Sequence, residues 1–193
     1  MTPGPHSDRS PPPFPVEAFD QSAPELAVRL IGVSIFVAGV GGVIVETEAY
    51  TRDDPASHSF AGPTSRNAAM FGQAGTAYVY RSYGLHWCFN IVAKDGGAVL
   101  LRALEPTAGL GDMVGRRGRA QALCTGPGRL TQALGIDAGH DGLSVSKKPF
   151  CMKDRAYAAE VVTGPRVGIS KAREQPWRFG LKGSPYLSRR FPA

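Results

Sequence analysis

Two acidic residues stand two positions apart in an otherwise apolar run, V-I-V-E-T-E-A-Y at residues 43–50. Side chains alternate along a strand, so every second residue of this run is predicted to share one face: Ile44, Glu46, Glu48 and Tyr50. A carboxylate shielded from bulk water can take a proton from a water molecule, which makes Glu48 a candidate general base. Strand carboxylates also commonly lie on solvated faces, and two acids could serve a sugar hydrolase, so spacing alone leaves these alternatives open.

Arg102 interrupts the apolar segment A-V-L-L-R-A-L at 98–104, which has the composition of a buried strand. A buried guanidinium group needs an acid or another anion beside it. Glu46 or Glu48 would satisfy it, and so would an ordinary structural ion pair with Glu105. The sequence by itself favours neither arrangement.

Tyr83 and Gly84 form the tip of a predicted hairpin, next to the basic residue Arg81. A tyrosine that projects from such a tip can fill the gap that an extruded base leaves in a DNA duplex. It can equally lie flat on the sheet surface as an ordinary turn residue.

Three further aromatic side chains, Tyr50, His58 and Tyr80, could provide flat surfaces for a flipped purine. Aromatic stripes more often belong to the core, and a loop histidine is more often solvated. His58 has no cysteine or histidine at metal-ligand spacing, so no metal site is predicted.

The elements that must position these residues alternate between strands and turns. We expect helices at 24–31 and 127–134, strands at 33–38, 43–50, 76–81, 85–92, 98–104, 159–162 and 177–181, a long functional loop at 51–75 and a mobile basic loop at 115–119. Successive hairpins predict an α+β fold: a single domain with a curved antiparallel β-sheet flanked by short helices and long loops.

The composition fits one domain with a basic surface. The chain has 193 residues, a hydrophobic fraction of 42% and a formal net charge of +6, which favours a polyanionic partner such as nucleic acid over an uncharged one. Cys88, Cys124 and Cys151 stand at unrelated spacings, which indicates free thiols rather than disulfides or a zinc site.

Residues 1–15 are rich in proline and have no apolar core segment, so we expect a disordered tail, neither a signal peptide nor a membrane anchor. Residues 16–193 are then the single domain. We expect a monomer that is soluble, intracellular and cytoplasmic.

Several blocks in one order resemble the alkyladenine DNA glycosylase family, also called mammalian-type 3-methyladenine DNA glycosylase. They are V-E-T-E-A-Y (45–50), D-P-A-S-H-S (54–59), G-P-T-S-R-N (62–67), M-F-G (70–72), Y-V-Y-R-S-Y-G (78–84), L-L-R-A-L-E-P (100–106), L-C-T-G-P-G-R-L (123–130), Q-A-L (132–134), R-V-G-I-S (166–170) and G-S-P-Y-L-S (183–188). The resemblance extends over most of residues 30–188.

The resemblance implies a role for each matching residue. Glu48 corresponds to the general base, and Arg102 and the main-chain carbonyl of Val167 to groups that hold the attacking water. Tyr83 corresponds to the intercalating tyrosine. The base-binding pocket would consist of Tyr50, His58 and Tyr80 around the flipped base, Asn90 as a screen against an exocyclic amino group, and the main-chain amide of Ala56 as a donor to the Hoogsteen edge.

The resemblance therefore implies a monofunctional DNA glycosylase of base excision repair, which needs no metal or cofactor. It would flip 3-methyladenine, 7-methylguanine or hypoxanthine from double-stranded DNA, with which it would associate in the nucleoid, and hydrolyse the glycosidic bond. Residues 107–120 align poorly, the tail has no counterpart, and His86 and Trp87 replace other aromatic residues. The rival hypotheses are a non-enzymatic, structure-specific DNA-binding protein, for which Glu48 is dispensable, and a hydrolase of free nucleosides or sugars, for which Tyr83 has no use.

Overall fold

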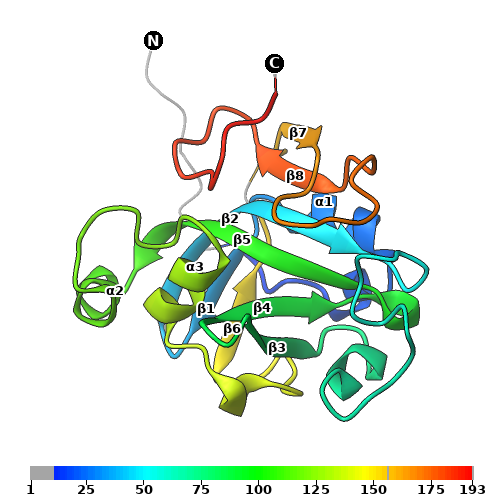
Figure 1. Ribbon diagram of the computed structural model, residues 1–193. Helices are drawn as coiled ribbons and strands as arrows, with labels where there is room; N and C mark the ends of the chain where they lie inside the picture. Colours follow the sequence, from blue (N-terminus) through cyan, green and yellow to red (C-terminus); the bar gives the residue numbers. More distant parts are fainter. Residues whose placement is uncertain (1–10, 156, 193) are drawn as a thin grey trace.

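The sheet is built around its central strand, β2. The computed structural model describes residues 11–155 and 157–192 (Figure 1). Eight strands form the sheet, in the order β3-β4-β5-β2-β1-β6, with β8 beside β2 and β7 beside β8. Their bounds are β1 Ser34–Val37, β2 Val40–Tyr50, β3 Ala77–Ser82, β4 His86–Val92, β5 Ala98–Ala108, β6 Phe150–Lys153, β7 Val161–Gly164 and β8 Arg178–Leu181.

Short helices cover this sheet. They are α1 Ala23–Leu30, α2 Leu110–Arg117 and α3 Pro127–Leu134, with 3-10 turns at Val16–Phe19, Ala68–Phe71, Lys94–Gly96 and Ala138–His140. The pairings between the named strands are antiparallel, and one large hydrophobic cluster joins the helices to the sheet. The predicted α+β fold with a curved antiparallel sheet is confirmed.

Helix α1 begins at Ala23, one residue before the predicted start at Pro24. The side chains of Ser22 and Glu25 cap the first turn reciprocally, and Pro24 occupies an early position where a missing N–H costs nothing. Leu26 and Leu30 are fully buried in the core that α1 shares with the sheet. Helix α1 therefore closes one face of β2 and leaves the other face for the site.

Strand β2 has partners along both edges, which removes its acidic residues from solvent. One edge pairs with β5, whereas the other pairs first with β1 and then, at Glu46–Glu48, with β8. Glycine is required where the backbones approach closely. A Cβ atom at Gly41 would lie 2.0 Å from a β1 carbonyl oxygen, and one at Gly42 would lie 1.9 Å from a β5 carbonyl oxygen.

Irregular pairing between β2 and β5 changes which residues share a face. The register skips Val45 on β2 and Arg102 on β5, so each strand carries one extra residue there. Ile44 consequently packs in the core with Ala49, and the prediction that Ile44 shares the face of the acids is wrong. The alternation resumes at Glu46. Bulges of this kind redirect side chains near functional sites, and here the redirected side chain is Arg102.

Two other predictions need correction. The proline-rich tail was expected to reach residue 15, but Phe14 is buried in the core and its amide donates to the Met152 carbonyl, so the boundary is too late. Residues 1–10 lie outside the described part. The predicted mobile basic loop at 115–119 begins inside α2, which packs against α3 through side chains such as Arg116 and Gln132. In the described ranges, no helix is long and apolar enough to cross a membrane.

Candidate active site

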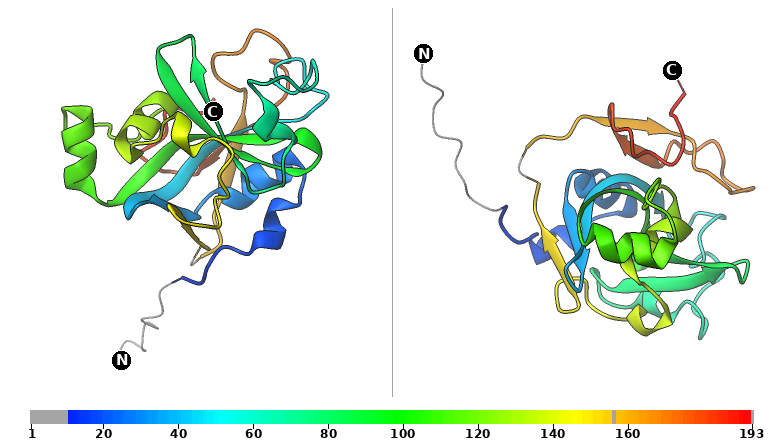
Figure 2. Two further views of the ribbon diagram at one scale, coloured as in Figure 1. Left: turned by 90° about the horizontal axis from the view of Figure 1, so that it is seen from below. Right: turned by 90° about the vertical axis from the view of Figure 1, so that its left-hand side faces the viewer.

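Three segments project on the same side of the sheet: the β3–β4 hairpin, the loop at 51–75 and the loop between β7 and β8 (Figure 2). They border a cleft of about 980 Å³. Its lining includes every predicted site residue except Glu48, namely Tyr50, Ala56, His58, Tyr80, Tyr83, Asn90, Arg102 and Val167. Glu48 is fully buried beneath this lining.

Two hydrogen-bond donors and one guanidinium group hold the Glu48 carboxylate. The Val167 amide donates to Oε1 over 2.7 Å, and the Tyr50 hydroxyl donates to Oε2 over 2.8 Å. The Arg102 Nη1 atom lies 3.3 Å from Oε1. Because all three partners also line the cleft, the carboxylate lies immediately beneath its floor.

The environment of Glu48 suits a general base. Burial raises its pKa above the usual range, and the nearby Glu46 charge acts in the same direction. Arg102 and the hydrogen bonds to Glu48 lower the pKa but do not cancel the effect of burial. A carboxylate with a raised pKa binds a proton more strongly than an exposed glutamate does, which favours proton transfer from water.

Glu46 lies in a different environment. Its carboxylate accepts hydrogen bonds from Arg178 Nε at 2.7 Å, Ser188 Oγ at 2.7 Å and Arg102 Nε at 3.2 Å, and also from the Ser188 amide. Glu46 is absent from the cleft lining, and its charge is balanced by two buried guanidinium groups. This arrangement is structural.

Arg102 connects the two acids. Its Nε atom donates to Glu46 and its Nη1 atom lies beside Glu48. Of the acidic partners considered for Arg102 from the sequence, the structure therefore has Glu46 and Glu48 rather than Glu105. The guanidinium group is nearly buried and still borders the cleft. It can therefore contact both Glu48 and a molecule in the cleft.

Aromatic rings supply much of the cleft wall. The His58 ring meets the Tyr80 ring edge-on at 4.5 Å between centroids, and Tyr80 stacks on Tyr78 at 5.4 Å. His58 Nδ1 shares a 2.8 Å hydrogen bond with the Tyr78 hydroxyl, so the histidine is fixed although its edge is exposed. Burial raises the pKa of Tyr78 to about 12, so it remains protonated at neutral pH. A flat heterocycle suits such walls.

Comparison with known proteins agrees with this geometry. The family model described as methylpurine-DNA glycosylase matches residues 17–185. A protein of Rhodopseudomonas palustris is 56% identical over 178 residues, which cover 90% of this chain and 89% of that protein. A protein of Granulibacter bethesdensis is 58% identical over 172 residues, 85% and 82% of the two chains. Both have the words 3-methyladenine DNA glycosylase in their names.

The chain belongs to the methylpurine-DNA glycosylase family. The family resemblance is confirmed, and so is the prediction of an enzyme of the DNA glycosylase class, a hydrolase of N-glycosidic bonds. The rival hypothesis of a non-enzymatic DNA-binding protein is thereby set aside.

The hairpin of this glycosylase presents Tyr83 to solvent. Ser82 accepts a hydrogen bond from the Leu85 amide, and Tyr83 and Gly84 both have positive φ, at 49° and 70°, as in a type I′ turn. Tyr83 is 88% exposed and Leu85 is 78% exposed. The tyrosine therefore projects from the tip and does not lie on the sheet surface.

The remaining predicted residues occupy defined positions. Asn90 is buried and donates to the Tyr78 carbonyl over 3.1 Å. The Ala56 amide, predicted to meet a purine, donates to Asp54 Oδ1 over 2.9 Å in this structure. For Val167, the interaction formed here is that of its amide with Glu48, whereas the prediction concerned its carbonyl.

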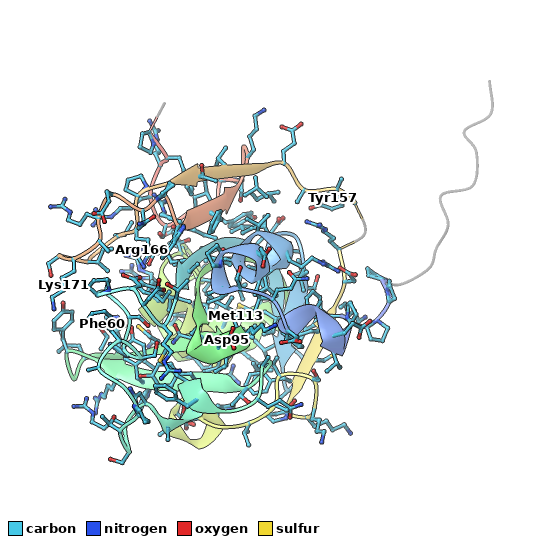
Figure 3. All side chains as sticks on the ribbon, turned by 90° about the vertical axis from the view of Figure 1, so that its right-hand side faces the viewer. Phe60, Asp95, Met113, Tyr157, Arg166 and Lys171 are labelled. Atoms are coloured by element: carbon cyan, nitrogen blue, oxygen red, sulfur yellow. The ribbon has the colours of Figure 1, made fainter. Side chains whose placement is uncertain are left out.

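Arg166 and Asp54 were not singled out from the sequence. They form a buried ion pair that joins the loop at 51–75 to the segment that carries Val167. Figure 3 labels Arg166 and, on the same segment, Lys171. Arg166 also donates to the Ala49 carbonyl over 3.0 Å, and its guanidinium group lies 4.7 Å from the centre of the Tyr50 ring. Their places in the blocks D-P-A-S-H-S and R-V-G-I-S were the available signal. In the described parts of the chain, no group of three or more His, Cys, Asp or Glu residues is placed to hold a metal ion.

Proposed function

We propose that this glycosylase flips an alkylated or deaminated purine out of duplex DNA into the cleft, where water activated by Glu48 hydrolyses the glycosidic bond. The observation that carries the proposal is the fully buried Glu48 carboxylate directly beneath an aromatic cleft. The 3-methyladenine, 7-methylguanine and hypoxanthine bases form the proposed substrate class.

The reaction needs one water molecule. Glu48 takes a proton from the water as its oxygen bonds to C1′ of the sugar, and the electron pair of the C1′–N bond leaves with the purine. An N-methylated purine already carries positive charge, which this electron pair neutralises. The products are the free base and an abasic site in the DNA. The DNA strand is not cut, because no lysine nucleophile takes part.

The other site residues are proposed to bind and orient the substrate. Arg102 and the Val167 carbonyl hold the water, while Tyr50, His58 and Tyr80 enclose the base. Asn90 screens purines by their exocyclic groups, and the Ala56 amide donates to the Hoogsteen edge. The last role requires the purine to share or replace the bond between Ala56 and Asp54.

Tyr83 is proposed to replace the flipped nucleotide in the base stack. Its exposure at the tip of a hairpin that borders the cleft supports this role, because a wedge must reach the duplex while the base enters the pocket. A hydrolase of free nucleosides would have no use for such a side chain. We propose that a monomer acts on double-stranded DNA in the nucleoid of the cytoplasm.

A gel assay tests the proposal. Duplexes that contain 7-methylguanine, 3-methyladenine or hypoxanthine are incubated with the protein and then divided, with and without alkali. Strand cleavage after alkali alone is the expected result, because it reveals abasic sites. Cleavage without alkali would indicate a lyase, and release of base only from free nucleosides would support the small-substrate alternative.

A fluorescent adenine analogue next to the lesion tests flipping separately. Its emission should rise when the enzyme binds, because extrusion of the neighbouring base unstacks the probe. Unchanged emission together with efficient base release would contradict flipping and leave the hydrolase assignment intact.

A further inference from the structure

The C-terminal segment, residues 182–192, is distant from Glu48 in the sequence but reaches the groups beside it. It follows β8 and runs back over the strands (Figure 1, red). Phe191 packs against Gly180 and Gly164, where a Cβ atom would lie 2.4 Å and 3.0 Å from its ring. The Arg178 guanidinium group lies 4.0 Å from the centre of the same ring. These contacts fix the segment on β7 and β8.

Ser188 brings this segment into contact with the buried charges. Its hydroxyl donates to Glu46 Oε1 over 2.7 Å and accepts from Arg102 Nη2 over 3.3 Å. A hydroxyl can do both, since it has one proton and two lone pairs. The Ser188 amide also donates to Glu46. One residue thus contacts both groups that flank the catalytic carboxylate.

Each nitrogen of the Arg102 guanidinium group then has its own partner. Nε contacts Glu46, Nη1 lies beside Glu48, and Nη2 contacts Ser188. A planar group held at three points cannot rotate without breaking at least two of these contacts. The position of Nη1 beside Glu48 therefore depends on the Ser188 contact.

We propose that Ser188 is a positioning residue for catalysis: it holds the Arg102 guanidinium group against Glu46 and thereby fixes its Nη1 atom beside Glu48. The proposal rests on the proposed role of Glu48. It makes the C-terminal segment part of the catalytic machinery, although Ser188 itself touches neither the substrate nor the reacting atoms.

The charge environment of Glu48 gives this role a distinctive consequence. Arg102 lowers the pKa of Glu48, second in size only to the opposing effect of burial. A looser Arg102 would lower it less, so Glu48 would remain protonated to higher pH. The titratable and charged groups that face Glu48 are Glu46, Tyr50, Tyr80, Cys88 and Arg102.

The test is Ser188→Ala in the full chain, measured by single-turnover release of 7-methylguanine from a duplex across a pH series. The substitution removes both hydroxyl contacts and leaves the Ser188 amide on Glu46. We expect the rate to fall about tenfold, as for the loss of one hydrogen bond to a charged group. The acidic limb of the pH–rate profile should move to higher pH, while duplex affinity stays within about twofold, since no contact at the cleft is lost.

Two further variants make the result specific. Ser188→Thr retains the hydroxyl and should recover most of the rate and the wild-type acidic limb. Ser184→Ala alters the same segment. The Ser184 hydroxyl accepts a hydrogen bond from the Tyr186 amide, away from Arg102 and Glu46, so this variant should leave the rate unchanged.

An Ser188→Ala variant with a lower melting temperature but an unshifted acidic limb would assign Ser188 a purely structural role and overturn the proposal. So would a wild-type rate and profile. If the wild-type chain itself releases no base, the proposed function fails, which is distinguishable from failure of the Ser188 role alone.

Discussion

Glu46 and Glu48 are identical side chains on one strand, yet they meet different groups. Glu46 contacts two guanidinium groups and both donors of Ser188, whereas Glu48 contacts one guanidinium group, a phenol and an amide. The charge of Glu46 is fully compensated. That of Glu48 is compensated in part, so it retains the tendency to take up a proton that a general base requires.

At the residue scale, we predict that Glu48→Gln reduces single-turnover base release by at least about 10²-fold, because an amide cannot take a proton from water. Duplex binding and the melting temperature at neutral pH should not fall. The raised pKa of Glu48 means that its ionisation at higher pH reduces the stability of the folded state, and glutamine avoids that cost. Single-turnover kinetics and a melting curve of the purified variant check this.

Glu46→Gln is the matched variant. It removes the negative charge that Arg102 and Arg178 share, and both guanidinium groups remain buried. We therefore expect the free energy of unfolding to fall by about 3–5 kcal/mol. Denaturant unfolding measures it. A stable Glu46→Gln variant together with an unstable Glu48→Gln variant would reverse the two assignments.

The pH dependence follows from the same environment. As the proposed general base, Glu48 must be ionised, and burial raises its pKa above the ordinary value of 4.5. The release rate for a methylated purine should therefore rise with pH along an acidic limb centred above that value. An acidic limb centred at or below 4.5 would contradict the role of a buried Glu48.

At the scale of elements, the β3–β4 hairpin holds Tyr83 in a turn that contributes nothing to the core. We predict that Tyr83→Ala lowers excision from a well-paired duplex by about tenfold or more, because extruding a base costs a few kcal/mol that the ring offsets. Excision of the same lesion from a mismatch should fall less, and the melting temperature should stay unchanged at this 88% exposed position. Equal losses on both duplexes would contradict the wedge role.

The sequence was informative about elements that follow simple periodicity. Helix α3 spans the predicted residues 127–134, and the β3–β4 hairpin turns at Tyr83–Gly84 as expected. Helix α2 was missed because Gly111 and Gly115 disfavour a helix, and it is packing of Met113 into the core and of the helix against α3 that stabilises it. The skipped residues Val45 and Arg102 were also missed, since a bulge leaves the composition of a strand unchanged.

The site shows the same division. Glu48, Arg102 and Tyr83 could be named as candidates from residue type and local pattern, because an acid or a cation in an apolar strand and an aromatic at a turn are unusual. The preference for Glu48 over Glu46 came from the family resemblance. The contacts of Glu46 with Arg178 and Ser188 could not be predicted, since these residues lie 132 and 142 positions away in the chain. No local period connects them.

At the scale of the whole molecule, the net charge of +6 should make duplex binding strongly dependent on salt. Arg119, which follows α2, and Arg129, in α3, are both exposed. Burial lowers the pKa of Arg117, and the charges of Arg129 and Arg119 lower it further, so the three arginines lie near one another. Helix α3 begins at Pro127, which lines the cleft, so we expect these arginines to lie beside DNA bound at the cleft.

We predict that replacing Arg119 and Arg129 by glutamine reduces the slope of log affinity against log salt concentration by about two, one for each lost phosphate contact. Fluorescence anisotropy with an undamaged duplex measures the slope. Lys147 and Lys148 are exposed on the turn before β6 and provide a control with equal loss of charge. Equal slopes for the two double variants would exclude a contribution from α2 and α3.

The proposed catalytic carboxylate, Glu48, lies far along the sequence from the residues that surround its neighbour Glu46. Arg178 and Ser188, the partners of Glu46, are synthesised long after the strand that carries Glu46 and Glu48. A chain still growing on the ribosome therefore contains both acids before it contains these partners. Burying Glu46 is unfavourable until Arg178 and Ser188 are made. Base release should therefore begin only once Ser188 has left the ribosome, and chains truncated after residue 182 should be inactive when chains that include residues 183–193 are active.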